Sequence, residues 1–552
     1  MSPTPLRRLE APADLGARTR EIAIRLTEWP SVTNTRDEAA FSLRLAGLLR
    51  SHPYFSARPD QVVVAPIPGD PLGRSNVLAI VRGTGDAACV LAGHFDVVPV
   101  DDYGDLKPLA FSPEPLREAM IARLEASGEH PGALEDLRSG AFLPGRGLLD
   151  MKAGLAAGIA VLEAFAADPS RQGNLVLVAT PDEEDRSAGM RAAADLLPGF
   201  LEENGLTARL GVNLDAIQDE HDGTGGRVVT FGCVGKLLLS ALVVGKEAHA
   251  AYPLAGVNAS YLAAEIASEI ELSPELADVS EGQRAAPPTV LGARDLKTGY
   301  NVTLPHAAWL TWNVLVHRRK ATEVLDVARR LVETACERAH ATMRRRRAAV
   351  GDLPMSVAWG HIPVRDFAEV LAAATARSPD FESEYKALAD DLATQHDLDL
   401  PTRSRRLAEA AWAASGLDGP AVVIGFGSMP YPAVHWPTGA ERLREGIREA
   451  MAQVQADHGL SVGEMAFFPA IADMSFVGPV DGADLAQAAA NTPIWGSSIR
   501  WDLSGGATPD IPFVNIGPWG RDYHHWLERV DEAYAFGALP HLVDAVVRKA
   551  LA

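Results

Sequence analysis

Residues 88–96 read Ala-Cys-Val-Leu-Ala-Gly-His-Phe-Asp, a short apolar run that ends in a histidine and an aspartate. A run of this kind predicts a buried β-strand. Because residues two apart in a strand face the same side, His94 and Asp96 should project together. A carboxylate beside a metal-binding imidazole fixes its tautomer and raises its basicity. The pair therefore suggests a metal ligand with its supporting carboxylate. The alternative is a strand end whose polar residues meet solvent.

Acidic residues follow three further segments of the first half. Asp150 stands directly before a predicted helix over residues 151–165, where capping of the helix is the alternative role. The run 182–185 places four carboxylates after a predicted strand, and they repel one another unless cations share the site. A solvated acidic loop is the alternative there. Asp215 closes another predicted strand, with a lone aspartate facing water as its alternative.

These groups should meet at one edge of a sheet. In open α/β sheets, ligands collect at the carboxyl ends of the strands. Three predicted strands deliver carboxylate or imidazole groups to that edge, and Asp150 is positioned to join them. A set of oxygen and imidazole donors suits hard or borderline divalent ions. The sequence therefore predicts a metal site in the first half of the chain.

The first half alternates short apolar runs with amphipathic stretches, which predicts strand–helix units in an α/β fold with a mostly parallel sheet. A second unit begins near Gly235, where two strands and two helices predict a smaller α+β insert that interrupts the α/β domain. Residues 421–424 and 513–516 resume buried-strand character after a helical stretch over 366–415. The predicted domains are a first part of the α/β domain over 1–235, the insert over 236–349, and a second part of the α/β domain over 350–552.

Composition restricts the classes of function. The net charge of −21 argues against nucleic-acid binding, and the basic run Arg344–Arg347 reads as a solvated helix end. No uncharged apolar run reaches the length of about 18 residues that a membrane helix needs. The three cysteines are too few and too scattered for a disulfide framework, and the start of the sequence lacks a signal-peptide pattern. We expect a cytoplasmic protein with no membrane partner.

Five segments, taken in order, resemble the dizinc aminoacylase and carboxypeptidase family, which includes acetylornithine deacetylase, succinyl-diaminopimelate desuccinylase and glutamate carboxypeptidase. The matching segments span residues 93 to 530 and are GHFDVVP, GRGLLDMKAG, TPDEEDRSAGM, GKEAHAAYPLAGVNA and GPWGRDYHHWLERV. The resemblance implies two divalent ions, zinc or else cobalt or manganese. It also implies an amidohydrolase that cleaves a small N-acyl amino acid or dipeptide-like substrate.

The resemblance also assigns roles by position. His94, Asp150 and Asp215 would hold one ion, and Asp150, Glu184 and His524 the other. His525 is the alternative to His524, which is preferred because Glu528 follows it by four positions. The insert over 236–349 would be the family's lid and dimerisation domain, and the parts over 1–235 and 350–552 would form the catalytic domain. Asp96 would support His94, Glu183 would be the general base, and His249 of the lid would reach the substrate. We further expect polar substrate contacts from His249, Asn301 and Arg318, and a homodimer formed through the lid.

Two departures from the family pattern bear on the substrate. The connection over residues 101–144 is longer than the family usually has, and together with 366–415 it resembles the arginine-utilisation RocB branch. The family has a lid arginine that grips a substrate carboxylate, and its position falls on Leu315 or a neighbour here, with Arg318 and Arg319 downstream.

Two rival functions remain open from the sequence. A bimetallic phosphoesterase would favour basic residues near the metals, for which Lys152 and Arg146 are the candidates. A non-catalytic binding protein on the same fold is the other rival. A serine hydrolase is unsupported, because the sequence shows no G-x-S-x-G elbow.

Overall fold

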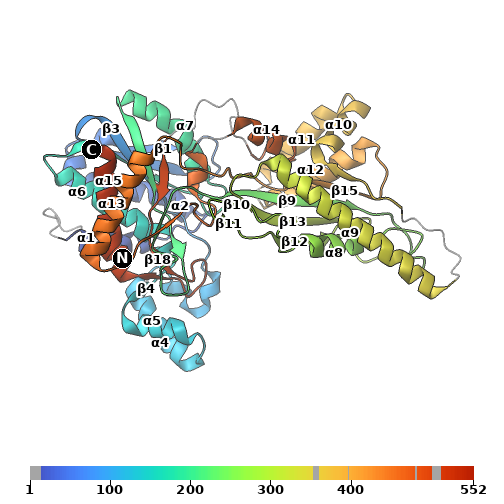
Figure 1. The fold of residues 1–552 in the computed structure, drawn as a ribbon, viewed down its shortest axis with the longest axis horizontal. Helices are drawn as coiled ribbons and strands as arrows, with labels where there is room; N and C mark the ends of the chain where they lie inside the picture. The colour runs from blue at the N-terminus through green and yellow to red at the C-terminus, as the bar shows by residue number, and fades with distance from the viewer. Residues whose placement is uncertain (1–13, 352–359, 396, 479–480, 500–510) are drawn as a thin grey trace. The chain divides into compact units, whose positions relative to one another are not determined.

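The chain forms two compact units in a computed structural model that describes residues 14–351, 360–395, 397–478, 481–499 and 511–552 (Figure 1). Unit 1 comprises Met1–Cys233, His435–Pro479 and Ala507–Ala552. Unit 2 comprises Val234–Val434 and Val480–Gly506. The mixed α/β character agrees with the predicted fold class. Among the described residues, no helix combines the length and the apolar character needed to span a membrane.

Unit 1 is built on a mixed eight-stranded sheet whose centre is parallel. Strand β3 pairs in parallel with β5 on one side and β6 on the other, and β6 pairs in parallel with β17. Antiparallel pairs stand at β1–β2, β2–β5 and β17–β8. In spatial order the strands are β1 (Val62–Pro66), β2 (Ser75–Arg82), β5 (Gln172–Thr180), β3 (Thr84–His94), β6 (Thr207–Asn213), β17 (Phe513–Asn515), β8 (Val228–Thr230) and β16 (Gly463–Met465).

A second, four-stranded sheet and a set of helices complete unit 1. The sheet has the order β4 (Phe142–Pro144), β19 (Arg529–Asp531), β18 (Trp519–Arg521) and β7 (Ile217–Gln218). The helices are α1 (Leu15–Thr27), α2 (Arg36–Ser51), α3 (Pro53–Ser56), α4 (Pro113–Ser127), α5 (Pro131–Ser139), α6 (Ala153–Ala167), α7 (Ala188–Glu203), α13 (Glu441–His458) and α15 (Leu539–Leu551). Short helical turns are η1 (Pro59–Gln61), η2 (Asp101–Leu109), η3 (Leu148–Lys152), η4 (Asp473–Phe476) and η5 (Ala533–Ala538).

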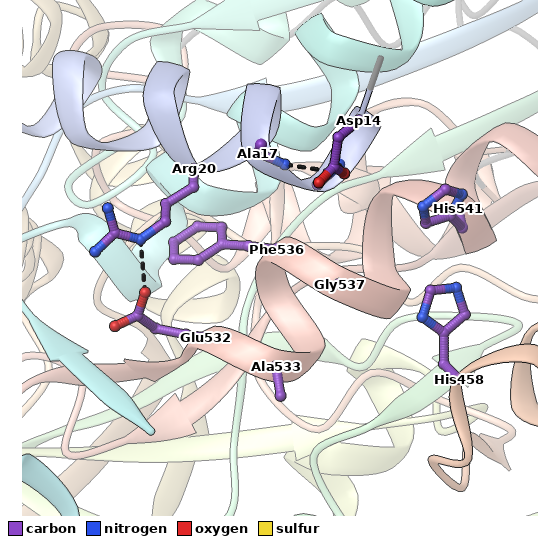
Figure 2. A pocket seen from close by; sticks show the side chains of 10 residues that line it. Asp14, Ala17, Arg20, His458, Glu532, Ala533, Phe536, Gly537 and His541 are labelled. Carbon is purple, nitrogen blue, oxygen red and sulfur yellow. Dashed lines mark hydrogen bonds and ion pairs between the residues drawn. The ribbon is translucent and has the colours of Figure 1, made fainter. Parts of the chain in front are cut away.

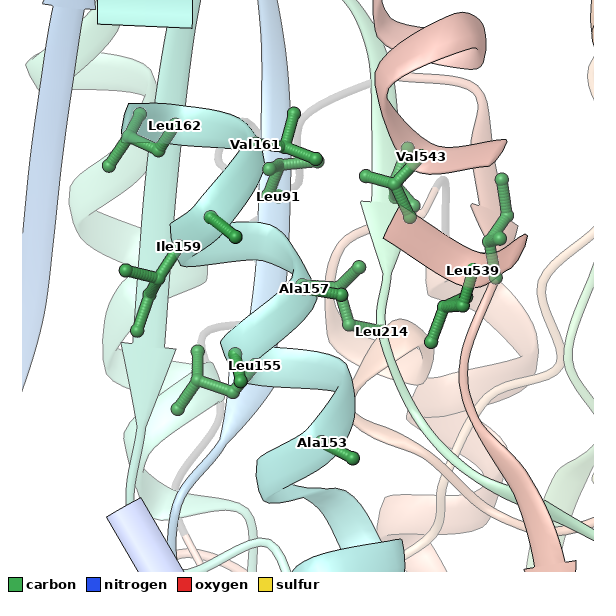
Figure 3. Packing of buried hydrophobic residues seen from close by; sticks show 14 of the residues in the cluster. Leu91, Ala153, Leu155, Ala157, Ile159, Val161, Leu162, Leu214, Leu539 and Val543 are labelled. Atoms are coloured by element: carbon green, nitrogen blue, oxygen red, sulfur yellow. The ribbon is translucent and has the colours of Figure 1, made fainter. Parts of the chain in front are cut away.

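Helix α6 runs through the core of unit 1. It is apolar on nearly all sides, as expected of a helix buried all round. Figure 3 shows its side chains in one cluster with Leu91, Leu214 and the α15 residues Leu539 and Val543. A Cβ atom added at Gly154 would lie 1.9 Å from the Leu214 carbonyl oxygen, so glycine permits this close approach. The packing brings η3, directly before α6, to the end of β6.

Unit 2 is built on a five-stranded sheet with the order β12 (Thr289–Asp295), β13 (Ala307–Val316), β9 (Gly235–Val244), β15 (Ala421–Phe426) and β14 (Val364–Asp366). Strands β10 (Val279–Ser280) and β11 (Gln283–Arg284) form a small hairpin. The helices of unit 2 are α8 (Ala259–Ile270), α9 (Ala321–Val350), α10 (Phe367–Arg377), α11 (Phe381–Thr394), α12 (Leu400–Ser415) and α14 (Gly482–Ala490).

One expectation differs from this fold. The predicted lid ended at residue 349, whereas unit 2 continues to Val434 and includes Val480–Gly506. The reason is that β15, predicted to return to the catalytic sheet, pairs antiparallel with β9 instead. The long connection over residues 101–144 is mostly helical, since it contains η2, α4 and α5, and its apolar side chains form a small cluster with Leu527.

Candidate metal centre

The carboxyl ends of three adjacent strands supply most of the predicted donors. His94 is the last residue of β3 and pairs in register with Thr180 at the end of β5. Glu183 and Glu184 follow β5, and Asp215 follows β6. Asp150 reaches the same edge from η3, because α6 packs tightly against the Leu214 segment. The structure therefore brings these groups to one sheet edge, as expected for parallel strands.

Asp150 stands between two histidines. One carboxylate oxygen, Oδ1, lies 3.2 Å from His94 Nε2, and the other, Oδ2, lies 3.2 Å from His524 Nε2. Asp215 Oδ1 lies 3.8 Å from His94 Nε2, and Glu184 Oε2 lies 3.1 Å from His524 Nε2. Three sets of three donors result, each with its atoms within 4.8 Å of one another. Two of them share Asp150, and the third joins His94, Glu183 and Glu184.

The alternative role of Asp150 as a helix cap is not realised. Lys152 occupies the N-cap position of α6, and no side chain there bonds the first turn. The Asp150 carboxylate faces the histidines instead.

Burial governs the protonation of this cluster. Burial by itself lowers the pKa of His94. Hydrogen bonds to carboxylates, first of all Asp150, outweigh the effect of burial and hold this pKa well above its ordinary value. Burial raises the pKa of Glu183 strongly, that of Glu184 to about 7, and that of Asp215 above its usual range. Several carboxylates thus share a buried space that protons or cations must neutralise. Oxygen and imidazole donors in this arrangement fit divalent ions.

Asp96 is buried beneath the cluster and contacts several of its members. Its carboxylate accepts hydrogen bonds from the main-chain amides of Glu183 at 3.0 Å and Glu184 at 3.2 Å. His94 Nδ1 lies 3.1 Å from the Asp96 main-chain oxygen and 3.6 Å from its carboxylate. Asp96 therefore contacts both the imidazole and the backbone of the acidic loop, whereas the sequence suggested only the first contact.

Two buried acids beneath the site had no role assigned from the sequence. Glu528 Oε1 accepts hydrogen bonds from the amides of Leu149 at 3.2 Å and Asp150 at 3.4 Å, which holds the Asp150 backbone. Its place four residues after His524 was the available signal. Asp473 Oδ2 accepts a 2.8 Å hydrogen bond from the Thr180 hydroxyl, and burial raises its pKa to about 7. Nothing in the local sequence around Asp473 marks this contact.

His524 and His525 take different positions. His524 lies against Asp150 and Glu184, and its pKa rises to about 11 because these carboxylates outweigh the effect of burial. His525 Nδ1 accepts a hydrogen bond from the Leu527 amide, and its ring centre lies 6.4 Å from that of His130. The geometry therefore favours His524 over its alternative.

The predicted substrate residues of unit 2 do not all lie together. His249 and Asn301 are exposed, and both contact Thr303, His249 through a backbone bridge and Asn301 through a 2.7 Å hydrogen bond from the Thr303 hydroxyl. Arg318 lies beyond the opposite end of β13, a strand of ten residues at about 3.3 Å each. It bonds Ser280 and pairs with Glu281. Arg318 therefore lies apart from the other two in this structure, and its contact with substrate stays a prediction.

A separate pocket of about 350 Å³ lies between α1 and η5 of unit 1 (Figure 2). It contains none of the predicted donors. Its arginine, Arg20, donates a 2.7 Å hydrogen bond to Glu532. The lining residues are Asp14, Gly16, Ala17, Arg20, His458, Glu532, Ala533, Phe536, Gly537 and His541. The pocket is therefore distinct from the candidate metal centre.

Comparisons with known proteins agree with the resemblance. The chain is 28% identical to Bacillus subtilis YqjN over 95% of this chain and 94% of that one, and 29% identical to Bacillus subtilis RocB over 96% and 94%. The metallo-carboxypeptidase Sso-CP2 of Sulfolobus solfataricus has a similar fold, with a TM-score of 0.51, 12% identity, and coverage of 97% and 99%. The model of peptidase family M20/M25/M40 matches residues 90–492, well over half of the chain. The chain therefore belongs to peptidase family M20/M25/M40.

Proposed function

We propose that this peptidase-family member hydrolyses an amide bond in a small N-acyl amino acid or dipeptide-like substrate. Two divalent ions, zinc or else cobalt or manganese, would be held by His94, Asp150, Asp215, Glu184 and His524. The observation that carries the proposal is the Asp150 carboxylate, which presents one oxygen to each histidine. When bound, two such ions lower the pKa of a water and stabilise negative charge on the attacked carbonyl oxygen.

Glu183 is the proposed general base. Its carboxylate lies 3.8 Å from His94 Nε2, beside the two sets of donors that share Asp150, where an ionised carboxylate could accept a proton from water. It would then pass this proton to the leaving amine. The second proton of the water leaves the new carboxyl group and is taken up by the amine, which gives a carboxylate and an ammonium product. Asp96 would hold the Glu183 main chain in place through its hydrogen bond.

Residues of unit 2 would complete substrate recognition. We propose that His249 donates a hydrogen bond to the developing oxyanion and that Asn301 contacts the polar part of the substrate. The exposure of both side chains leaves them available for such contacts. The similarity to RocB favours a substrate from arginine-related metabolism. We also propose that unit 2 is the region through which two copies of the chain form a dimer.

The phosphoesterase alternative finds little support in the structure. Lys152 donates a 2.9 Å hydrogen bond to the Trp29 carbonyl, and Arg146 pairs with Glu528 and Asp102. Both candidate phosphate ligands are thus engaged with the protein. The two complete donor sets likewise weigh against a non-catalytic binding protein.

The proposal is tested by substrate assays. Zinc-loaded protein is incubated with N-acyl amino acids, dipeptides, their C-terminal amides, and a phosphomonoester. We expect hydrolysis within the first two series. Exclusive hydrolysis of the phosphomonoester would support the rival, and turnover of neither class would count against the amide assignment.

A further inference from the structure

The loop that presents His524 connects β18 to β19, which pair with each other in antiparallel fashion. Asp522 and His524 in this loop have φ angles of +55° and +62°, which non-glycine residues seldom adopt. Such backbone conformations persist only when surrounding contacts hold them. The groups that fix the two ends of the loop therefore bear directly on the position of the His524 imidazole.

One carboxylate, that of Asp136 on α5, joins both ends of the loop. Arg521 Nη1 donates to the two Asp136 oxygens at 2.9 and 2.7 Å, and Arg529 Nε donates to Asp136 at 2.8 Å. Arg521 and Arg529 are directly paired across the two strands. The side chains of Asp136 and Arg529 are 13% and 4% exposed, so solvent screens this bridge less than an ordinary surface ion pair.

The helices around Asp136 also pack against the loop. Leu527 is 2% exposed and lies in one apolar cluster with Met120 and Leu137. The Arg123 guanidinium lies 4.9 Å from the centre of the Trp526 ring. Figure 1 shows α4 and α5 beside β4. Apolar packing and the charged bridge thus tie the same loop to the same helical segment.

We propose that Asp136 is a positioning residue for His524, an inference that rests on the proposed metal centre. By bridging Arg521 and Arg529, Asp136 keeps the ends of the loop in register and the imidazole against Asp150 and Glu184. Loss of a supporting contact of a metal ligand typically lowers affinity by about 10- to 100-fold. Asp136 acts through two arginines, so an effect of about tenfold is expected, at the low end of that range.

The test is a zinc titration of metal-free protein by calorimetry, which needs no substrate. Wild-type protein should bind two ions, and Asp136→Ala should bind one of them about tenfold more weakly while the other is unchanged. In a His524→Ala background, Asp136→Ala should cause no further loss, because the bridge acts through that imidazole. If Asp136 had a purely structural role, Asp136→Ala would weaken the binding of both ions. Alternatively, it would lower zinc affinity further when combined with His524→Ala.

Glu125→Ala is the matched control, because Glu125 makes an exposed ion pair with Arg138 within the same helical segment. It should leave both affinities unchanged. Arg521→Gln removes one of the two arginines that Asp136 joins, and it replaces Asp136→Ala if that variant does not fold. It should give the same loss of affinity for one ion only. Unchanged affinities in the folded variants, or equal loss for both ions, would overturn the positioning role. A wild-type protein that binds fewer than two ions would contradict the proposed function instead, so the two failures are distinguishable.

Discussion

The metal-site cluster of unit 1 and the polar surface around His249 in unit 2 are built in opposite ways. In unit 1, His94 and Asp215 are 1% and 6% exposed, and only the His524 side chain among the five proposed ligands is largely open, at 45% exposed. In unit 2, His249 and Asn301 are exposed, beside a Tyr300 side chain that is 96% exposed. Buried ionisable groups are costly unless paired or bound to metal, whereas exposed polar groups need no ligand. The cluster by itself therefore indicates a ligand, while the role of the surface depends on what approaches it.

The largest effect is expected where the two donor sets overlap. Asp150→Ala removes both carboxylate oxygens, one from each of the two sets that share this residue, so the protein should lose affinity for both ions and nearly all turnover. Metal analysis after dialysis measures this directly. Asp105→Ala, at an aspartate whose side chain is 84% exposed, is the control and should retain both ions. Loss of one ion alone would show that Asp150 is not shared.

The next prediction separates chemistry from metal binding. Glu183→Gln should lower turnover by about 100- to 10,000-fold, because an amide cannot accept the proton, with metal content near that of the wild type. Glu184→Ala should instead deplete one ion. Parallel measurements of turnover and bound metal distinguish the two variants. Wild-type turnover in Glu183→Gln would remove the assigned base.

His249 tests whether the exposed surface takes part at all. His249→Ala should lower turnover by about 100-fold or more, as for loss of an oxyanion donor, and leave metal content unchanged. If the proposed dimer shares this residue between subunits, mixing His249→Ala with Glu183→Gln protein should restore part of the activity. No restoration would place His249 in its own subunit's reaction. Full activity of His249→Ala would restrict the active site to unit 1.

Arg318 should have the smallest effect. It pairs with Glu281 at the end of β13 opposite Asn301, and exposed pairs of this kind contribute little. Arg318→Ala should change the preference for a substrate carboxylate over its C-terminal amide by less than about twofold. Comparison of kcat/KM for the two substrates gives the answer. A preference abolished by the variant would restore Arg318 as the carboxylate clamp.

The donors that end strands were predictable from the sequence, because parallel strands bring their carboxyl ends together. His94 and Asp215 follow from that rule alone. The choice of His524 required the family resemblance, since it lies in a loop far along the chain. Asp473 and Asp136 act through contacts to residues hundreds of positions away, Thr180 and Arg521, and no local pattern marks such contacts.

The extent of unit 2 was not predictable for a related reason. The apolar run at β15 predicts a buried strand but does not specify the sheet it joins. Its pairing with β9 assigns it to unit 2, together with α10, α11 and α12. The separation of Arg318 from Asn301 was not predictable either, because a gap of this size in the sequence does not show that the full length of β13 lies between them.

The most direct test of a two-ion amide hydrolase is to titrate zinc into chelator-treated wild-type protein while hydrolysis of N-acyl amino acids and dipeptides is measured. The account predicts that the metal-free protein is inactive and that turnover returns as two equivalents bind. Full turnover without metal, or two bound ions with no hydrolysis of either substrate series, would contradict it.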